Sequence, residues 1–499
     1  MVAAEFFRSH RFPTSVRARL VGLAAAVCFG AVHSVQAQSP LLSSDSAAAL
    51  SSSALVSLPD IVRDAELAGV RWPRITDVAP DLERAYVARN WAPLWLRDGR
   101  PTAAARAMID ALGRVDHRGL ESRDYDVDRL QGMLRSGFAS SGARADFEAV
   151  LSVASLRVVR ALRSGRVPAS DAAPRASRDS VSYAEALVAL AAAPQPATML
   201  DAMEPRFAQY RRLKEALASY RAQPEQDIEA RSRANRIALS MERWRQLPQQ
   251  AARTQIIVNI PAFQLSVMST TASGTMRQLD MDVVVGSAFN SRTPAFSDSL
   301  QYLVFAPYWD VPASIARSEL VPIGLRDPYL LKLNNYEVIG RRGRPVPMTL
   351  AAVRDVQRGK AHIRQLPGGT NALGRVKFMF PNQYDVYLHD SPMQNAFQKQ
   401  RRDLSHGCIR VADPAALAAL LLRDQTAWDS TAIAKAMNGK AAQRVNLRQA
   451  VPVHLLYATA VAHDDGSVTF LEDIYGQDAE LAARIARGYP YSRAAVSVK

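Results

Sequence analysis

The spacing of apolar residues changes near Arg253 and separates two parts of the chain that must differ in fold class. From about residue 60 to residue 220, apolar side chains recur every three or four positions, which is typical of amphipathic helices. One such run is Phe147, Val150, Leu151 and Ala154. After Arg253, short runs rich in β-branched residues are interrupted by Pro and Gly, which indicates strands. The pattern predicts an α+β multidomain chain, with an all-α N-terminal part followed by a β-rich, sandwich-like domain.

The N-terminal segment has the composition of an export signal. Residues 1–37 combine a basic start, a short apolar run and the small-residue cleavage site Val35-Gln36-Ala37. The Ser/Ala-rich residues 38–58 are expected to form a flexible tether. We therefore expect an exported protein, which would stay associated with the inner membrane if the signal is not cleaved.

The 499 residues leave room for two or three domains. We assign residues 59–222 to a helical domain, 223–250 to a connecting helix, 251–478 to the β-rich domain and 479–499 to a C-terminal tail. Within the β-rich domain, residues 307–373 are rich in Pro and Gly and have too few contiguous apolar runs to form an independent core. Loops of this length in compact domains are usually either functional or disordered, and the sequence pattern allows both for this segment.

Several local elements can be predicted inside the β-rich domain. Strands are expected over residues 254–260, 263–268, 278–285 and 301–305, with 269–277 as a hairpin loop. Asp413 and Pro414 should start a helix that runs to Leu422. A terminal hairpin is expected from residues 453–462 and 467–471.

The chain has two cysteines, Cys28 and Cys408, and Cys28 lies in the export signal. Cys408 is therefore the sole thiol expected in the exported protein. A lone thiol cannot form a disulfide within the chain and is a poor zinc site, because structural zinc requires several Cys and His ligands together. Nucleophilic chemistry uses this residue best, since a nearby histidine can lower the pKa of a thiol or accept its proton.

Alternation along two short segments predicts which side chains share a face. In residues 385–389, Tyr387 and His389 alternate with two apolar residues, as on a half-buried strand. Cys408 and Arg410 alternate with Ile409 and Val411 in the same way. After His389, helix-start signals at 391–394 predict an α-helix with Ser391 as its N-cap.

Gly407 lets the backbone approach whatever Cys408 attacks. The amides of Gly407 and Cys408 can polarise a carbonyl oxygen. Arg410 adds a fixed positive charge that suits a substrate with a carboxylate.

These residues carry a family resemblance. His389, a spacer of fifteen residues and the motif Ser405-His406-Gly407-Cys408-Ile409-Arg410 resemble the signature of the L,D-transpeptidases of peptidoglycan. Residues 258–263, 374–382, 386–390 and 451–457 are similar to motifs of the large, periplasmic, multidomain branch, which has a helical scaffold domain. The likeness extends from about residue 253 to residue 477. One difference is that no room remains between residues 220 and 230 for the small peptidoglycan-binding module that many members carry.

The resemblance implies roles for individual residues. Cys408 would be the nucleophile and His389 the general base, oriented by the side chain or the backbone carbonyl of Asp390. The amides of Gly407 and Cys408, with Tyr387, would stabilise the oxyanion, and His406 would shape the cleft. The residues expected to contact substrate, together with the capping segment 307–373, are Arg410, Trp309, Tyr308 and Asn371.

The resemblance also implies the reaction, a crosslinking of peptidoglycan stem peptides. Cys408 would attack the carbonyl of a tetrapeptide donor, release D-alanine and form a thioester, which the diaminopimelate amine of a second stem would resolve. No metal or organic cofactor is implied, and wall synthases are possible partners. The net charge of +15 alone would allow nucleic acid as a partner, but no nucleic-acid motif accompanies it, and an anionic wall polymer suits it as well.

Two alternatives remain at this stage. A cysteine wall-peptide hydrolase or carboxypeptidase would use water as the acceptor, although the common papain-like hydrolases place Cys before His in the sequence. A catalytically silent wall-binding scaffold is the alternative from a different class. The reactivity of the Cys408 thiol separates this second alternative from the enzymes.

Overall fold

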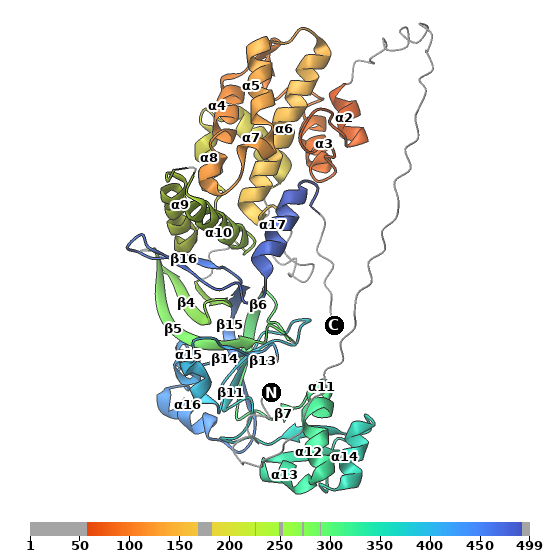
Figure 1. Ribbon diagram of the computed structural model, residues 1–499, viewed down its shortest axis with the longest axis vertical. Helices are drawn as coiled ribbons and strands as arrows, with labels where there is room; N and C mark the ends of the chain where they lie inside the picture. Colours follow the sequence, from red (N-terminus) through yellow and green to blue (C-terminus); the bar gives the residue numbers. More distant parts are fainter. Residues whose placement is uncertain are drawn as a thin grey trace, which may run out of the picture.

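The structure, a computed structural model, describes residues 57–167, 182–224, 226–248, 253–271, 274–289 and 291–491. The expected signal and all but the end of the expected tether lie outside the described residues. Along the long axis of the molecule, a helical part is followed by a β-rich part and then by a smaller mixed part (Figure 1). The helical N-terminal and β-rich C-terminal regions confirm the predicted fold class.

The helical part is built around α6 (Ser141–Ser164), whose side chains are buried on nearly all sides between Phe147 and Leu162. Ser140 caps its start by accepting a hydrogen bond from the amide of Ala143, and Gly165 follows its end. Shorter elements surround it, and all of them except β2 contribute buried residues to its core. They are α2 (Leu58–Asp64), α3 (Ala79–Val87), β1 (Leu96–Arg97), β2 (Arg100–Pro101), α4 (Ala103–Leu112), η1 (Val115–Arg118), η2 (Ser122–Tyr125), α5 (Val127–Ser136), α7 (Tyr183–Ala192) and α8 (Pro196–Ala202).

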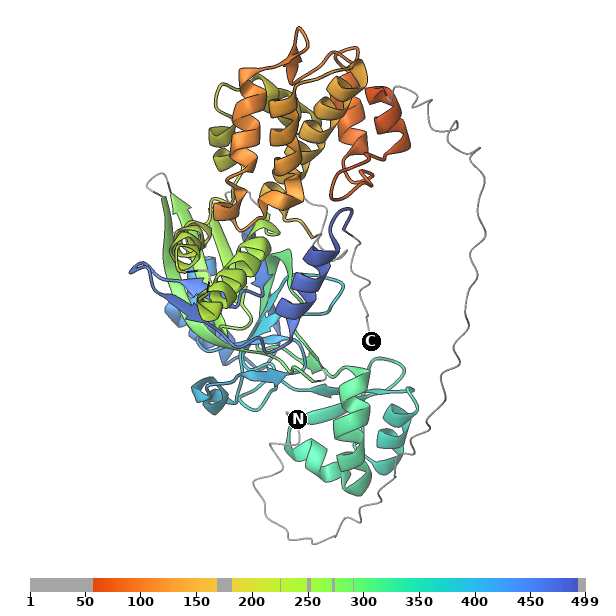
Figure 2. The same ribbon diagram turned by 45° about the horizontal axis from the view of Figure 1, so that its top comes forward.

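Helices α9 (Ala208–Arg221) and α10 (Ile228–Arg245) join the helical part to the sheet. They lie between the two parts in both views (Figures 1 and 2). Ile237 and Met241 of α10 belong to one apolar cluster with Ile257 and Leu456 of the sheet. The predicted connecting helix is therefore α10, and it is packed against the β-rich part.

The β-rich part contains a sheet with the order β13-β5-β14-β12-β11-β6-β15-β3-β4. Strand β5 pairs with both β14 and β4, so the sheet curls back on itself around one apolar core. The strands are β3 (Thr254–Asn259), β4 (Gln264–Thr271), β5 (Gly274–Gly286), β6 (Phe296–Phe305), β11 (Val376–Met379), β12 (Leu388–His389), β13 (Asp403–Ser405), β14 (Ile409–Val411) and β15 (Gln443–Leu456).

The predicted hairpin loop over residues 269–277 is wrong. Ser269 pairs with Met276 and Thr271 with Gly274, so strand pairing continues almost to the turn. Residues 272 and 273, between the two strands, lie outside the described part. Polar residues such as Arg277, which is exposed, resemble loop residues in a sequence, but they also suit an antiparallel ribbon with one face in solvent.

The insertion at residues 307–373 forms a small subdomain with its own core, which we call the cap. Its sheet has the order β7-β10-β8-β9, and the buried core residues include Leu320, Val338, Val353 and Ile363. The expectation that this segment lacks an independent core is wrong, because its apolar residues come from many short elements. These are β7 (Trp309–Asp310), α11 (Ala313–Ile315), η3 (Ala316–Leu320), α12 (Val321–Arg326), α13 (Pro328–Leu333), β8 (Tyr336–Ile339), β9 (Pro345–Val346), α14 (Leu350–Gln357) and β10 (His362–Gln365).

The C-terminal region returns to the helical part. After α15 (Pro414–Leu422) and α16 (Ser430–Met437), the hairpin of β16 (Ala460–Ala462) and β17 (Val468–Phe470) leads into α17 (Gln477–Arg487). The predicted start of α15 is confirmed, because Asp413 accepts a hydrogen bond from the amide of Ala416. The assigned tail at 479–499 instead begins inside α17. Asp478 anchors that helix by binding Arg243 of α10 and Thr459 of the connecting segment.

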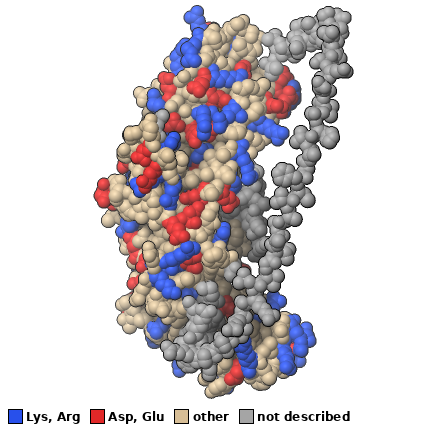
Figure 3. All heavy atoms as spheres, viewed as in Figure 1, with Lys and Arg blue, Asp and Glu red and all other residues tan. Residues whose placement is uncertain are grey.

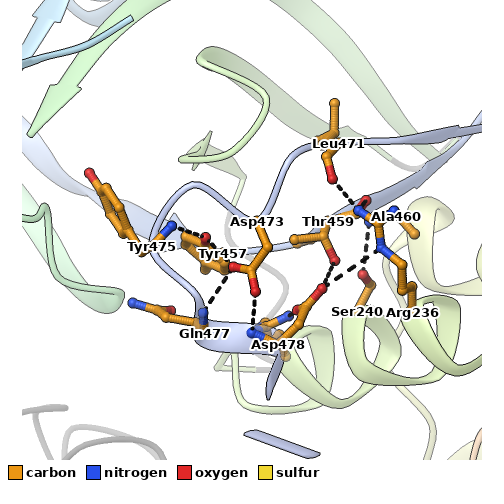
Figure 4. A network of polar contacts seen from close by, with 12 residues as sticks. Arg236, Ser240, Tyr457, Thr459, Ala460, Leu471, Asp473, Tyr475, Gln477 and Asp478 are labelled. Atoms are coloured by element: carbon orange, nitrogen blue, oxygen red, sulfur yellow. Dashed lines mark hydrogen bonds and ion pairs between the residues drawn. The ribbon is translucent and has the colours of Figure 1, made fainter. Parts of the chain in front are cut away.

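Figure 4 shows this junction from close by, with Arg236 and Ser240 of α10 facing the segment between β15 and α17. The Ser240 hydroxyl accepts a hydrogen bond from the amide of Ala460 at 3.0 Å. The polar network therefore adds to the apolar cluster that joins α10 to the sheet.

The charged side chains of the surface are mixed. On the face shown in Figure 3, basic and acidic residues alternate over the helical part and the sheet. The formal charge of +15 is therefore not gathered into one large patch on this face. Within the described residues, no helix is both long enough and apolar enough to cross a membrane.

Candidate active site

The candidate site lies on one face of three adjacent strands. Phe378 of β11 pairs with Leu388 of β12, which pairs with Ile409 of β14, and all three belong to the sheet core. The neighbouring residues point the other way because side chains alternate along a strand. Lys377, His389 and Arg410 therefore form a row on the opposite face, in register with one another. The predicted faces of His389 and Arg410 are confirmed.

Cys408 immediately precedes β14 and follows Gly407, whose φ of 113° is one that side chains disfavour. The Ser405 hydroxyl donates to the Cys408 carbonyl at 2.5 Å and accepts from the Gly407 amide at 3.1 Å. The hydroxyl of buried Thr293 donates to the Gly407 carbonyl at 2.7 Å. Sequence reasoning missed Thr293, which lies far away in the chain and carries no motif.

The bond from the Gly407 amide to Ser405 bears on the predicted oxyanion hole. That amide already has an acceptor, so an oxyanion would have to displace the Ser405 hydroxyl to bind there. The Cys408 amide has no such contact with the described residues. The oxyanion role of these two amides remains a prediction, and Cys408 is the better placed of the two.

The Cys408 thiol is held in its protonated form. Its sulfur lies 3.5 Å from the carbonyl oxygen of Asp385, to which the thiol donates. Burial raises the pKa of the Cys408 thiol to about 11, although hydrogen bonds from Tyr387 act in the opposite direction. Among the described residues, the thiol makes no hydrogen bond to His389. A nearby histidine was expected either to lower the pKa of the thiol or to accept its proton. In this arrangement His389 does not lower the pKa of the Cys408 thiol.

His389 is buried and neutral. Desolvation, followed by the charge of Arg410, lowers the pKa of His389 to about 3, despite hydrogen bonds to the carbonyls of Asp390 and Leu373. The Nδ1 atom lies 2.6 Å from the Asp390 carbonyl oxygen. Because a carbonyl only accepts, Nδ1 carries the proton of the neutral ring and Nε2 keeps a lone pair. His389 is thus in the form that a general base requires.

The structure separates the two expected roles of Asp390. Its carbonyl orients His389, whereas its carboxylate accepts hydrogen bonds from the amides of Arg375 at 2.8 Å and Ser391 at 2.7 Å. Burial raises the pKa of the Asp390 carboxyl, and these amides oppose the shift. Gly374 has a φ of 63°, and a Cβ placed there would lie 2.4 Å from Asp390 Cγ. Gly374 therefore makes room for the carboxylate, a role that the sequence analysis did not assign.

Tyr387 and Arg410 flank the histidine. Tyr387 packs against the sheet core and the cap core, and its ring centroid lies 5.8 Å from that of His389. Arg410 is buried, and its Nη1 lies 3.7 Å from Met393 Sδ. The guanidinium lowers the pKa of both His389 and Cys408. Binding of a substrate carboxylate by Arg410 remains a prediction.

The three cap residues expected to contact substrate have clear places in the fold. Trp309 is buried in the cap core, with its ring centroid 6.3 Å from that of Tyr336. Half-buried Tyr308 lies under the guanidinium of Arg364, at 4.4 Å. Asn371 is fully buried, and its amide donates to the carbonyls of Pro307 and Leu366. These contacts hold the cap together where it leaves the sheet, and their role in substrate binding stays a prediction.

His406 connects the site to the cap. Its Nε2 atom lies 2.7 Å from Oε1 of Glu319 in η3. The residue therefore reaches from the loop of Cys408 to the cap, and its expected role in shaping the cleft stays a prediction.

The α-helix predicted after His389 is wrong. Residues Gln394–Gln398 form the single 3₁₀ turn η4, and Ser391 only caps the preceding turn by accepting from the Met393 amide at 3.2 Å. This short turn places Ala396 and Phe397 against Val284 before the chain enters β13. A longer helix would carry the chain past β5, with which β13 must pair.

Comparison with known proteins indicates an enzyme family of the L,D-transpeptidase type. Residues 253–434 match the family described as the L,D-transpeptidase catalytic domain, and residues 80–217 match the family described as the Scaffold domain. The chain therefore carries a region that matches the L,D-transpeptidase catalytic domain, preceded by a region that matches the Scaffold domain, as the sequence resemblance indicated.

A curated relative has the same assignment. The chain is 29% identical over 246 residues to the "Putative L,D-transpeptidase" of Haemophilus influenzae, which covers 49% of this chain. The match spans 48% of the length of that relative. A structure of Bdellovibrio bacteriovorus Bd1075 matches at 12% identity, over 47% of this chain and 56% of the other. The TM-score is 0.18, so no conclusion is drawn from this match.

Proposed function

We propose that the protein is a periplasmic peptidoglycan L,D-transpeptidase that crosslinks stem peptides through a thioester on Cys408. The observation that supports this most strongly is that His389 ends β12 while Cys408 immediately precedes the adjacent parallel strand β14, on the face opposite the core. The family match adds the substrate class, peptidoglycan. Export rests on the composition of residues 1–37 alone.

The first half-reaction is an acyl transfer to sulfur. Nε2 of His389 takes the proton of Cys408 as the sulfur attacks the carbonyl that precedes the terminal D-alanine of a tetrapeptide. The C–N bond then breaks, His389 returns the proton to the leaving amine, and D-alanine departs. The Cys408 amide faces the oxyanion during both events.

In the second half-reaction, the diaminopimelate amine of another stem attacks the thioester. His389 removes a proton from the amine and delivers it to the departing sulfur, which restores the thiol. A resting pair of neutral thiol and neutral imidazole suits this cycle, because proton transfer then accompanies attack. The neutral thiol also limits unproductive oxidation in an oxidising compartment, since thiolates are the oxidisable form.

The test compares wild-type protein with Cys408→Ala, using purified disaccharide tetrapeptides as both donor and acceptor. Chromatography with mass detection should show a crosslinked dimer and free D-alanine for wild type, with a rate at least about 1000-fold lower for the variant. Tripeptide without dimer would instead assign a carboxypeptidase that uses water. Unchanged peptides, together with a thiol that resists alkylation, would assign a silent scaffold.

A further inference from the structure

Lys377 shares a face and a register position with the proposed base. It pairs directly with His389 across β11 and β12, so their side chains leave the sheet side by side. Its ammonium nitrogen lies 5.7 Å from the ring centroid of Tyr387. Lys377 therefore lies in the row that ends at Arg410, two residues after Cys408, although it has no role in the proposed reaction so far.

The ammonium group of Lys377 is half-buried, and the Tyr387 ring is the only partner that the described residues give it. Within the part of the chain that the structure describes, no carboxylate comes within ion-pair distance of Lys377 and no acceptor forms a hydrogen bond with it. Burial lowers the pKa of Lys377, and the charges of Asp310 and Cys408 act against that shift. A half-buried cation with no ion pair is unfavourable unless a ligand completes it.

The two groups that interact electrostatically with Lys377 belong to the cap and to the loop of the nucleophile. Asp310 lies in β7 of the cap, and Cys408 precedes β14 of the sheet. Asp310 is exposed and its carboxylate lies 3.5 Å from His362 Nε2, so it is already engaged within the cap. An acceptor for the Lys377 ammonium group would therefore have to come from a molecule that binds beside Cys408.

The chemistry of the donor supplies such an acceptor. In a peptide whose last residue is the leaving group, the terminal carboxylate lies three bonds from the attacked carbonyl carbon, within about 4 Å. A cation that binds this terminal carboxylate must therefore lie close to the nucleophile. The other cation of the row, Arg410, is buried and contacts Met393, so it is less accessible to a substrate.

We propose that the Lys377 ammonium binds the C-terminal carboxylate of the donor peptide and so selects donors that end one residue beyond the attacked carbonyl. This inference rests on the proposed function for the identity of the donor. It makes Lys377 a specificity-determining residue. A donor with one further residue moves its carboxylate away from Lys377, and a C-terminal amide removes the charge.

The first experiment measures binding and needs no turnover. Full-length Cys408→Ala and Cys408→Ala/Lys377→Met proteins are titrated by calorimetry with a tetrapeptide and with its C-terminal amide. The single variant should bind the acid about 10- to 100-fold more tightly than the amide, because a charge-assisted hydrogen bond is lost with the amide. The double variant should bind both equally. Lys435→Met, which removes an exposed lysine of α16, is the matched control and should keep the preference.

A second experiment uses the active thiol. Lys377→Met should raise KM for the acid donor by about 10- to 100-fold with little change in kcat, and Lys377→Arg should recover most of this loss. The pH profile of Cys408 alkylation should move little, which separates binding of substrate from an action on the thiol. Thermal melting confirms that each variant is folded.

The outcomes separate this proposal from the proposed function. If the acid-to-amide ratio of binding constants is the same with and without Lys377, Lys377 does not bind the carboxylate. The same conclusion follows if neither peptide binds. If Lys377 sets the ratio but wild type makes no crosslink from these donors, the carboxylate site stands and transpeptidation fails.

Discussion

His406 in the loop of Cys408 and Glu319 in the cap lie 2.7 Å apart, from Nε2 to Oε1. The two residues belong to parts with separate apolar cores, one in the sheet and one in the cap. Tyr387 packs against both cores from between them. The polar contact and the tyrosine therefore connect the cap to the sheet and to the loop that carries Cys408.

Breaking this polar contact should let water compete for the thioester. Closed caps exclude water, and exclusion favours attack by an amine over hydrolysis. Glu319→Ala should therefore raise the ratio of hydrolysed tripeptide to crosslinked product about two- to tenfold, while the rate of Cys408 acylation changes less. Muropeptide chromatography on the purified enzyme gives both products.

The matched control is Glu337→Gln, which removes an ion pair between Glu337 and Arg364 inside the cap and leaves His406 untouched. It should keep the wild-type product ratio. A fall of both products in proportion for Glu319→Ala would mean that the cap only supports the site. A deletion within residues 341–360 that removes α14 would be a poorer test, because it also removes the buried Val353 from the cap core.

Gly374→Ala should disable the site by moving Asp390. A methyl group at this position would lie 2.4 Å from Asp390 Cγ, so the carboxylate and the carbonyl that holds His389 must shift. We expect a loss of about 1–3 kcal/mol in stability and at least a 100-fold loss of crosslinking. The measurements are thermal unfolding and product formation.

Gly343→Ala controls for backbone strain, because Gly343 also has a positive φ of 69° but nothing lies within 4 Å of a Cβ there. It should lose stability but keep activity. Equal activity losses in the two variants would contradict the steric role of Gly374.

The residues of the site were easier to predict than their supports. Alternation along single strands placed Leu388 and Ile409 in the core and so put His389 and Arg410 on one face. The cap core could not be predicted, because Leu320, Val353 and Ile363 meet only after several short elements have folded. Thr293 and Lys377 were also not assigned roles, since one supports Gly407 and the other pairs with His389 only through strand register.

The alkylation rate of Cys408 should rise steeply with pH. With the thiol pKa raised by burial to about 11, the thiolate fraction grows about tenfold per pH unit between pH 7 and pH 10. His389, with its pKa lowered to about 3 by desolvation, is neutral over this range and supplies no charge to the thiolate. His389→Gln should therefore leave the midpoint of iodoacetamide alkylation almost unchanged and still abolish crosslinking.

This result would separate a general base from a preformed ion pair. A wild-type midpoint below pH 8 that rises in His389→Gln would show a thiolate–imidazolium pair instead. Alkylation is followed by the mass of the intact protein, so the readout does not depend on activity.

The junction between the helical part and the sheet depends on a buried charge cluster. Glu242 of α10 is fully buried, and its carboxylate lies 2.8 Å from Arg245 and 3.3 Å from Arg166. Burial alone would raise the pKa of Glu242, but the two arginines and the amides of Val167 and Arg166 lower it below the usual value. Arg245 also bonds the Tyr210 hydroxyl of α9 at 3.2 Å, so the cluster holds the helix pair together.

Glu242→Gln should destabilise the protein by about 3–5 kcal/mol at neutral pH, because it leaves two buried cations uncompensated. Since the folded pKa of Glu242 is depressed, its contribution is present above the unfolded pKa near 4.5 and is lost as the pH falls through the folded pKa. The melting temperature of wild type should therefore fall more steeply below pH 4.5 than that of the variant.

Glu229→Gln, which removes an exposed pair with Arg233 on the same helix, should change stability by less than about 1 kcal/mol. Calorimetric unfolding between pH 3 and pH 8 gives both quantities, and equal losses in the two variants would show that the buried cluster does not hold the junction.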